Sequence, residues 1–458
     1  MKPCMIRKLY SNPILFAVLG IALASAIALS KVSRGLSWSY LSSPWTWTAT
    51  PGCSISSSPS SHAIDKRKRL SKEFINLERI FDHASVLREG SQRDEGLERI
   101  FPDSDYVPKG EVYRNAPALR RSYMLMEKMF KIFVYEEGEP PLFHYGPCKN
   151  IYSMEGLFFG FIEQDKLYGT WDPGEAHVYF LPFSVVMIVE HLFHPIIRDK
   201  AVLGRTVVDY VRIISNKYPY WNRSVGVDHF MLSCHDWGPR ATWYMRELFY
   251  NSIRVPCNAN SSEYFNPKKD ASFSEINLIA GEIENHTGGL PPSSRTVLAF
   301  FAGKQYHGKI RPILFQQWKE NDKDIQVYET LPQGLSYHDM MRKSKYCLCP
   351  SGNEVASPRI VEAIYTECVP VLISQHYVLP FSDVLNWNSF SVNVTVSDIP
   401  NLKKILLGIP QDQYLRMQEC VKQVQPHFLV NDPPKRYDVF NMIIHSIWLR
   451  RMNVRIYS

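Results

Sequence analysis

The part of the sequence that most constrains the fold runs from residue 345 to residue 374. Residues 346–349 are short and apolar and predict a buried strand, and residues 369–373 predict a second one. Between them, Ser357 and Pro358 predict the start of a helix, with the serine hydroxyl at the N-cap and proline at the first helical position. A strand, a helix and a strand in this order form a crossover between parallel strands. We therefore expect a parallel β-sheet.

The loop of this crossover, residues 350–354, is polar and leads into a helix that carries Arg359 and Glu362. Free backbone N–H groups at this edge of a parallel sheet favour the phosphates of a nucleotide. Glu362 could hold a ribose, since a carboxylate accepts hydrogen bonds from two hydroxyls. The alternative is a surface ion pair, because Arg359 and Glu362 lie three residues apart on the helix.

Apolar segments of strand length alternate with helical patterns along most of the remaining chain. The predicted strands are residues 131–135, 176–183, 229–234, 296–302, 325–328 and 388–396, and the predicted helices are residues 152–164, 205–218, 309–319, 337–344 and 437–451. A polar stretch, residues 258–294, separates the first three strands from the others and is interpreted as an interdomain linker. The pattern predicts an α/β fold of two halves, each with a parallel sheet, and a cleft between them.

An uncharged run of 18 residues, 13–30, follows a basic N-terminus. A run of this length can just span a bilayer, and the preceding positive charge predicts a cytoplasmic tail of residues 1–12 and a lumenal remainder. The alternative is a cleaved signal peptide. Residues 31–118 are expected to form a stem, and the repeat of Leu-Glu-Arg-Ile-Phe at 77–81 and 97–101 makes this stem a candidate for homo- or hetero-oligomerisation.

Four Asn-X-Ser/Thr triplets agree with entry into the secretory pathway, at Asn222, Asn260, Asn285 and Asn393. Nine cysteines in a chain of 458 residues do not make a disulfide scaffold. The net charge of +7 is spread along the chain without a long basic run, so we do not expect nucleic-acid binding.

The loop that follows residues 296–302 is rich in glycine and cations. Gly303, Gly308 and Lys309 have the spacing of a P-loop, but Ile310 stands where serine or threonine would hold Mg²⁺. The preferred interpretation is a loop that meets a diphosphate of another kind, with Arg311 pairing with phosphate oxygens. An ordinary turn is the alternative.

Asp228, His229 and Asp236 flank one predicted strand, and each is a candidate general base for a hydroxyl acceptor. Because they lie at opposite ends of that strand, we do not expect all of them in one site. A structural hydrogen-bonding role is compatible with each of them.

No metal site is predicted. The Asp-X-Asp patterns at 103–105 and 322–324 do not follow buried strands, so they are interpreted as chance matches to metal-dependent sugar transferases. Cys347 and Cys349 lack partners at the spacing of a zinc site, and buried or disulfide-bonded cysteines are favoured instead.

A run of motifs now becomes recognisable. It comprises residues 226–230 (GVDHF), 235–238 (HDWG), 301–303 (FAG), 307–308 (HG), 336–339 (SYHD), 347–352 (CLCPSG), 357–359 (SPR) and 362–364 (EAI). From about residue 111 to the C-terminus, the sequence resembles the exostosin family, glycosyltransferase family 47. Residues 123–128 (YMLMEK) and 433–436 (PPKR) are most similar to its plant cell-wall branch.

The resemblance implies a GT-B fold of two facing Rossmann-like domains. Residues 119–290 would form the acceptor-side domain, and residues 291–458 would bind the nucleotide-sugar and end in a closing helix. It implies a single-pass type II protein of the Golgi membrane. This enzyme would move a sugar from a UDP-sugar to a cell-wall polysaccharide or proteoglycan glycan, with inversion and without a metal or other cofactor.

Mapped onto these motifs, Arg311 and the helix at Ser357 would stabilise the UDP leaving group, and Glu362 would hold the ribose. The expected donor-binding residues are Gly303, Lys304, His307, Arg311, Ser351, Gly352, Ser357, Arg359 and Glu362. The candidate bases remain Asp236, His229 and Asp228. Two alternatives stay open, namely a lumenal sulfotransferase that uses the loop 303–309, and a non-catalytic partner subunit of a glycosyltransferase complex.

Overall fold

The computed structural model describes residues 106–279, 286–319 and 322–453. All described residues belong to one compact unit of the chain. The predicted tail, membrane anchor and most of the stem, together with the triplet at Asn285, lie outside the described residues. Within the described ranges, no helix combines the length and apolar character needed to span a bilayer.

The first half of the described chain contains a four-stranded parallel sheet in the order β1-β2-β3-β4. Its strands and helices are α5 (Ala116–Met129), β1 (Ile132–Val134), α6 (Ser153–Gln164), β2 (Val178–Phe180), α7 (Val185–Leu192), α8 (Ala201–Lys217), α9 (Pro219–Ser224), β3 (His229–Ser233), α10 (Gly238–Thr242), α11 (Arg246–Tyr250) and β4 (Ile253–Pro256). β2, β3 and β4 are buried along their whole length, which explains their nearly continuous apolar sequences.

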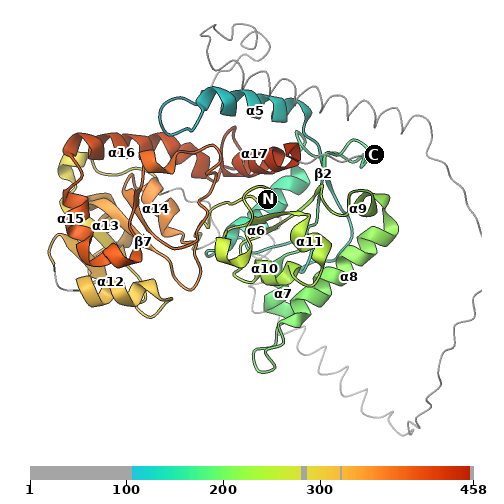
Figure 1. Cartoon of the computed structure of the whole chain (residues 1–458), viewed down its shortest axis with the longest axis horizontal. Coiled ribbons are helices and arrows are strands. Elements are labelled where there is room, and N and C mark those ends of the chain that lie inside the picture. The colour runs from blue at the N-terminus through green and yellow to red at the C-terminus, as the bar shows by residue number, and fades with distance from the viewer. Residues whose placement is uncertain (1–105, 280–285, 320–321, 454–458) are drawn as a thin grey trace, which may run out of the picture. The chain divides into compact units, whose positions relative to one another are not determined.

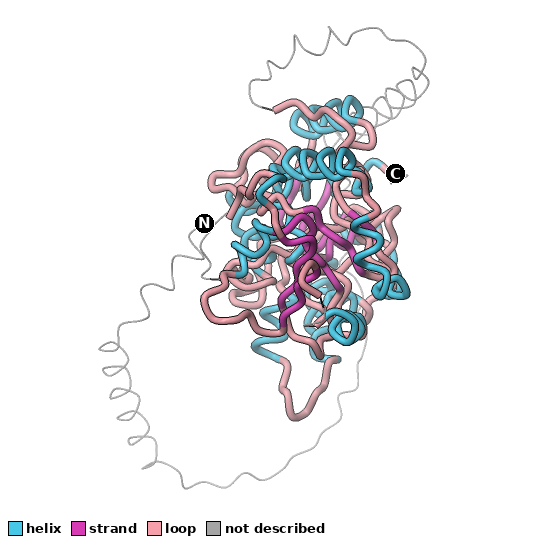
Figure 2. Tube along the Cα trace, turned by 90° about the vertical axis from the view of Figure 1, so that its left-hand side faces the viewer, coloured by secondary structure: helices cyan, strands magenta, loops and turns pink. Residues whose placement is uncertain are grey.

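The second half contains a five-stranded parallel sheet in the order β6-β5-β7-β8-β9. Its strands and helices are β5 (Val297–Ala302), α12 (Ile310–Trp318), β6 (Ile325–Tyr328), α13 (Tyr337–Lys343), β7 (Ser344–Pro350), α14 (Arg359–Tyr365), β8 (Val369–Ile373), β9 (Val392–Asn393), α15 (Leu402–Leu407), α16 (Gln411–Val424) and α17 (Val439–Met452). Figure 2 shows the strands in magenta with helices on either side. The predicted α/β architecture with two parallel sheets is confirmed.

The second sheet has a topological switch point between β5 and β7. From β5 the chain moves outward to β6 and then returns to the other side of β5 as β7. In parallel sheets, ligands bind in the crevice at the carboxyl ends of the strands where the order reverses. The loops that follow β5 and β7 lie at this crevice. The described strands of the first sheet run in consecutive order and contain no such reversal.

The last described helix, α17, packs against the first half of the chain. His445 Nε2 lies 3.0 Å from Ser122 Oγ on α5, and Arg451 Nε donates to the carbonyl oxygen of His177. Figure 1 shows α17 beside α5. Residues N-terminal to α5 are also packed, since Tyr113 is buried and its hydroxyl lies 2.7 Å from His427 Nε2. The two halves therefore exchange elements at both ends of the described chain.

Two local predictions need correction. Ser357 does not cap α14, because the helix begins two residues later with Pro358 at the N-cap, and the hydroxyl of Ser357 is buried without a hydrogen-bond partner among the described residues. The predicted strand 388–396 is mostly not a strand. A 3-10 helix (Trp387–Ser389) precedes the two-residue β9, because the indole of Trp387 is buried and donates to the carbonyl oxygen of Pro380.

The polar stretch interpreted as a linker is packed over much of its length. Asp270 is fully buried and accepts hydrogen bonds from Arg254, and residues 271–276 are buried as well. A 3-10 helix, Ser261–Glu263, lies within the stretch. At Asp270 the polarity of the stretch reflects buried hydrogen bonding, whereas residues 261–264 and 266–268 are exposed to solvent.

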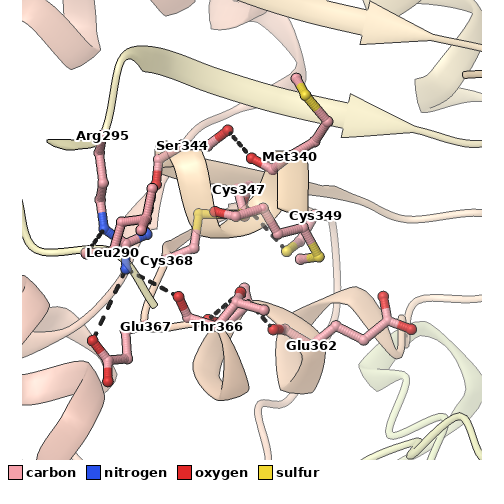
Figure 3. Close-up of a disulfide and its surroundings, with 12 residues drawn as sticks. Leu290, Arg295, Met340, Ser344, Cys347, Cys349, Glu362, Thr366, Glu367 and Cys368 are labelled. Carbon is pink, nitrogen blue, oxygen red and sulfur yellow. Dashed lines mark hydrogen bonds and ion pairs between the residues drawn. A yellow bond between two sulfur atoms is a disulfide. The ribbon is translucent and has the colours of Figure 1, made fainter. Parts of the chain in front are cut away.

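Two disulfides join elements of the described chain. Cys347 in β7 is bonded to Cys368, which directly precedes β8 (Figure 3). Cys234 and Cys257 join the ends of β3 and β4. Beside the first disulfide, Arg295 donates to the carbonyl oxygens of Leu290, Ser344 and Thr366, which holds the start of the second half against β7 and α14.

Candidate active site

The loops that follow β5 and β7 touch each other through glycine. Gly308 has φ +83°, and a Cβ built on it would lie 1.8 Å from the carbonyl oxygen of Gly352. A Cβ on Gly352 would lie 2.4 Å from Nδ1 of His307 and 3.1 Å from Nη2 of Arg311. Only glycines allow this approach. The two loops thereby place His307 and Arg311 side by side at the switch point.

Two arginines converge on Phe301 at the end of β5. The guanidinium carbons of Arg311 and Arg359 lie 5.7 Å and 5.1 Å from the centre of its ring. Arg359 donates to the carbonyl oxygen of Ala302, and a Cβ on Gly303 would lie 2.5 Å from its Nη2. Burial and the charge of Arg359 lower the pKa of Arg311 to about 10. Tyr337 and Glu275 act in the opposite direction, but they do not offset the effects of burial and Arg359.

Three buried polar atoms at this place have no hydrogen-bond partner among the described residues. They are Nε of Arg311, Nδ1 of His307 and Oγ of Ser357. Burial, followed by the charges of Arg311, Arg359 and Lys304, lowers the pKa of His307. Unsatisfied buried donors next to cations are typical of a site that is completed by an anionic ligand. The arrangement fits a diphosphate.

Ser351 has a structural role in the loop. Its hydroxyl donates to the carbonyl oxygen of Val355 and lies 2.7 Å from Oγ of Ser374, while its N–H donates to Ile373. Lys304 is exposed at the mouth of the first loop. The hydroxyl of Ser351 is therefore already engaged within the loop, which makes it the weakest of the predicted donor contacts.

Glu362 lines a cavity of about 250 Å³. The hydroxyl of Tyr337 donates to its Oε2 at 2.7 Å, which orients the carboxylate. Pro358, Val361 and Tyr365 of the α14 segment form one wall, and Ile276–Ile279, His286 and His338 form the others. An oriented carboxylate in a mainly apolar pocket of this size can hold a ribose with an attached base.

Asp236 follows β3 in the first half and carries two hydrogen bonds on Oδ1. Tyr152 donates its hydroxyl at 3.4 Å, and Asn258 donates from Nδ2 at 3.3 Å. Burial nevertheless raises the pKa of Asp236. A partly buried carboxylate with a raised pKa is suited to accept a proton near neutral pH.

Asp228 and His229 do not share this position. They lie at the opposite end of β3 and are almost fully buried. Nδ1 of His229 donates to Asp228 at 2.8 Å, and Tyr135 donates to Nε2 at 2.8 Å. Arg223 also pairs with Asp228. These bonds occupy both nitrogens of the imidazole, so the pair is a core network and we retain Asp236 alone as the candidate base.

Sequence reasoning missed three residues at the junction of the two halves: Asn258, Glu275 and Glu354. Burial, then the charges of Asp236 and Glu354, raise the pKa of Glu275 to about 8, against the influence of Arg359 and Arg311. Burial, then Asp236 and Glu263, likewise raises the pKa of Glu354 to about 8. Asn258 and Glu275 lie in the stretch interpreted as a linker. The signal that could have revealed them is a polar side chain between apolar residues, which is typical of a buried polar group.

No cluster of three or more His, Cys, Asp or Glu side chains suited to a metal ion occurs in the described part of the chain. Asp322 and Asp324 pair with Lys403. Among the candidate glycosylation sites, Asn222 and Asn393 are exposed. Asn260 is buried, and its Oδ1 accepts hydrogen bonds from the N–H and hydroxyl of Ser262.

The sequence of this chain is similar to a known protein family and to several of its members. Residues 126–409 match the family model of the exostosin GT47 domain. The chain is 61% identical over 463 residues to Probable glycosyltransferase At3g07620 of Arabidopsis thaliana, with 98% of each protein covered. It is 26% identical over 350 residues to Probable glucuronosyltransferase GUT1 of Oryza sativa subsp. japonica, covering 69% of this chain and 80% of that protein. A solved structure titled "Crystal Structure of TarM" is 12% identical with a TM-score of 0.24, covering 43% of this chain and 52% of that one, and we base no argument on it.

Proposed function

Because this chain belongs to the exostosin GT47 family and is a glycosyltransferase, we propose that it moves a sugar from a UDP-sugar to a hydroxyl of a cell-wall polysaccharide or proteoglycan glycan. We further propose that the two parallel sheets form the facing domains of a GT-B fold. The alternative of a sulfotransferase is replaced by the family assignment. A non-catalytic partner subunit remains an outcome of the test below.

The observation that carries this proposal is the uncompensated charge at the switch point. Arg311 is 6% exposed, its Nε has no hydrogen-bond acceptor among the described residues, and the influence of Glu275 does not offset the cost of its burial. A buried cation without an anion is strongly unfavourable unless a ligand supplies the anion. The diphosphate of a nucleotide-sugar would pair with Arg311 and Arg359 and would accept from His307 and Ser357.

The remaining parts of a nucleotide fit the neighbouring cavity. Glu362 would accept hydrogen bonds from both ribose hydroxyls, held in orientation by Tyr337. The apolar wall of Val361 and Tyr365 would cover the base. In this assignment Glu362 and Arg359, which lie three residues apart on α14, would hold the ribose and the diphosphate of one donor.

In the proposed reaction, Asp236 takes the proton from the acceptor hydroxyl as its oxygen attacks the anomeric carbon. Attack from the face opposite the UDP group inverts the configuration at that carbon. Arg311 and Arg359 stabilise the negative charge that develops on the leaving UDP, which supplies electrostatic stabilisation from the protein itself. No residue of this scheme requires a bound metal.

We propose a lumenal Golgi location, with residues 13–30 as the membrane anchor and residues 31–118 as a stem that could mediate oligomerisation. The disulfides Cys347–Cys368 and Cys234–Cys257 support an oxidising compartment. Exposed Asn222 and Asn393 are accessible for glycosylation.

UDP binding to the full-length protein tests the proposal. We expect Arg311→Ala to weaken UDP affinity by roughly 10-fold to 100-fold, because a buried charge-assisted hydrogen bond is lost. Arg311→Lys should weaken it less, because lysine keeps the charge but not the bidentate geometry of the guanidinium. Arg416→Ala is the matched control, since Arg416 forms an exposed ion pair with Asp412 on α16. Unchanged UDP affinity in both Arg311→Ala and Glu362→Ala would show that the site is misplaced.

Two further assays test whether the protein is an active transferase: the rise in melting temperature on addition of a nucleotide, and the hydrolysis of a UDP-sugar. Stabilisation by UDP, followed by hydrolysis of a UDP-sugar, supports the transferase. Absence of stabilisation by any nucleotide favours the partner subunit. UDP-glucuronate is the first donor to test, because several rice relatives are named probable glucuronosyltransferases.

A further inference from the structure

Glu275 is a buried carboxyl at the junction of the two halves. It is 4% exposed and has no hydrogen-bond partner among the described residues. The next residues, Ile276–Ile279, line the cavity of Glu362. An unpartnered carboxyl in such a place is rare, because burial of an ionised carboxylate without hydrogen bonds is very unfavourable.

The groups that interact electrostatically with Glu275 come from both halves. Asp236 and Glu354 are like charges and oppose its ionisation, whereas Arg359 and Arg311 favour it. Tyr152 and Tyr377 also interact with its charge. Burial and the two carboxyls outweigh the two arginines, so the pKa of Glu275 rises to about 8.

Hydrogen bonding separates the roles of the neighbouring carboxyls. Asp236 receives two donors, from Tyr152 and Asn258, and these stabilise its charged form. Glu275 receives none among the described residues. When neighbouring carboxyls have different environments, one stays ionised and another keeps its proton.

Resting on the proposed function, we propose that Glu275 works in its neutral form and donates its carboxyl O–H to an oxygen of the donor diphosphate. Arg311 and Arg359 would then be engaged by the same diphosphate. The negative charge of the diphosphate would neutralise Arg311 and Arg359, which are the two groups that favour an ionised Glu275. Bound donor and protonated Glu275 therefore stabilise each other, and an ionised Glu275 would repel the diphosphate.

The test measures UDP affinity of the full-length protein from about pH 6 to about pH 9. We expect wild-type affinity to hold near pH 6.5 and to fall several-fold between about pH 7 and 9, as Glu275 loses its proton. Glu275→Gln retains a neutral hydrogen-bond donor of the same shape, so it should bind within about threefold of wild type near pH 6.5 and lack the alkaline fall. Glu275→Ala should bind roughly tenfold more weakly near pH 6.5.

Glu354→Gln is the matched control, because it neutralises a neighbouring carboxyl and leaves Glu275 in place. It should keep the alkaline fall, displaced to lower pH because Glu354 no longer opposes the ionisation of Glu275. Circular dichroism and the melting temperature verify the fold of each variant. Glu275→Gln binding as weakly as Glu275→Ala, or wild-type affinity that is flat from about pH 7 to 9, would overturn the inference. Wild-type protein that binds no UDP at any pH would instead overturn the proposed function, and this inference with it.

Discussion

Asn258 donates a hydrogen bond from Nδ2 to Oδ1 of Asp236 at 3.3 Å. Its own Oδ1 accepts the N–H of Ala356 at 3.1 Å. Asp236 belongs to the first half, and Ala356 lies directly before Ser357 in the second. One amide that is 2% exposed thus ties the candidate base to the loop of the donor site.

Asn258→Ala should lower kcat by roughly 10-fold to 100-fold, because Asp236 loses a donor and its fixed orientation. UDP affinity should fall much less than kcat, since Arg311 and Glu362 remain in place and only the bond to the N–H of Ala356 is lost on the donor side. Steady-state kinetics with the acceptor and direct UDP binding separate the two effects. Asn251→Ala is the control, because Asn251 also donates from its side chain but to a surface carbonyl, that of Val225. An unchanged kcat in Asn258→Ala would mean that Asp236 does not need this bond.

The approach of the two phosphate loops gives a second prediction. Gly308→Ala places a methyl group 1.8 Å from the carbonyl oxygen of Gly352, so the loops must separate. We expect UDP affinity to fall at least roughly tenfold, because His307 and Arg311 move away from the anion. Equilibrium binding of UDP measures the effect.

Gly334→Ala distinguishes loop separation from backbone strain. Gly334 has φ +87°, close to the +83° of Gly308, but a Cβ built on it would have no atom of the described residues within 4 Å. Its substitution should lower the free energy of unfolding by about 1 kcal/mol without changing UDP affinity. Equal loss of affinity in the two variants would contradict the role assigned to the contact.

The network around Asp228 gives a prediction on pH and stability. Burial raises the pKa of Asp228, but hydrogen bonds from His229 and Ser224 and the charge of Arg223 outweigh it, and the pKa falls to about 2. A carboxyl with a depressed pKa contributes stability above its unfolded pKa of about 4 and loses it as the pH falls toward about 2. Asp228→Asn should therefore lower the free energy of unfolding by about 2 kcal/mol at about pH 7, and by progressively less below about pH 4.

Urea unfolding at about pH 7, 4 and 3 measures this difference. Asp209→Asn is the control, because Asp209 forms an exposed ion pair on α8 and should have little effect. Asp228→Asn should retain kcat at a temperature where it stays folded. A large loss of kcat at unchanged stability would make Asp228 and His229 candidate catalytic residues again.

The local sequence could predict elements whose burial is complete. Residues 369–373 form β8 as predicted, because an apolar run flanked by polar residues has few alternatives inside a parallel sheet. The sequence could not tell which end of β3 carries the site. His229 and Asp236 both flank that strand, and only the pairing of Tyr179 with His229 in the sheet shows that His229 is buried.

The junction residues were hidden for a different reason. Asn258 and Glu275 lie in a polar stretch, and their burial results from packing between two halves that are distant in sequence. Local periodicity contains no information on such contacts. The glycines at 308 and 352 were visible in the sequence, and the structure shows that their two loops meet. That these loops bind a diphosphate remains our proposal.

The disulfide between Cys347 and Cys368 gives the last prediction. It closes a loop over a sequence separation of 21 residues that includes α14 and the residues around Arg359 and Glu362. A cross-link of this loop length restricts the unfolded chain by about 3 kcal/mol. Cys347→Ser should therefore lower the melting temperature by several degrees. A reducing agent should lower that of the wild-type protein by at least as much, because it also opens the Cys234–Cys257 disulfide. Cys349→Ser is the control, because Cys349 is buried next to the disulfide without being part of it, so it reports the effect of a buried thiol alone. If the Cys349 variant were as unstable as the Cys347 variant, packing at β7 rather than the covalent bond would hold α14 in place.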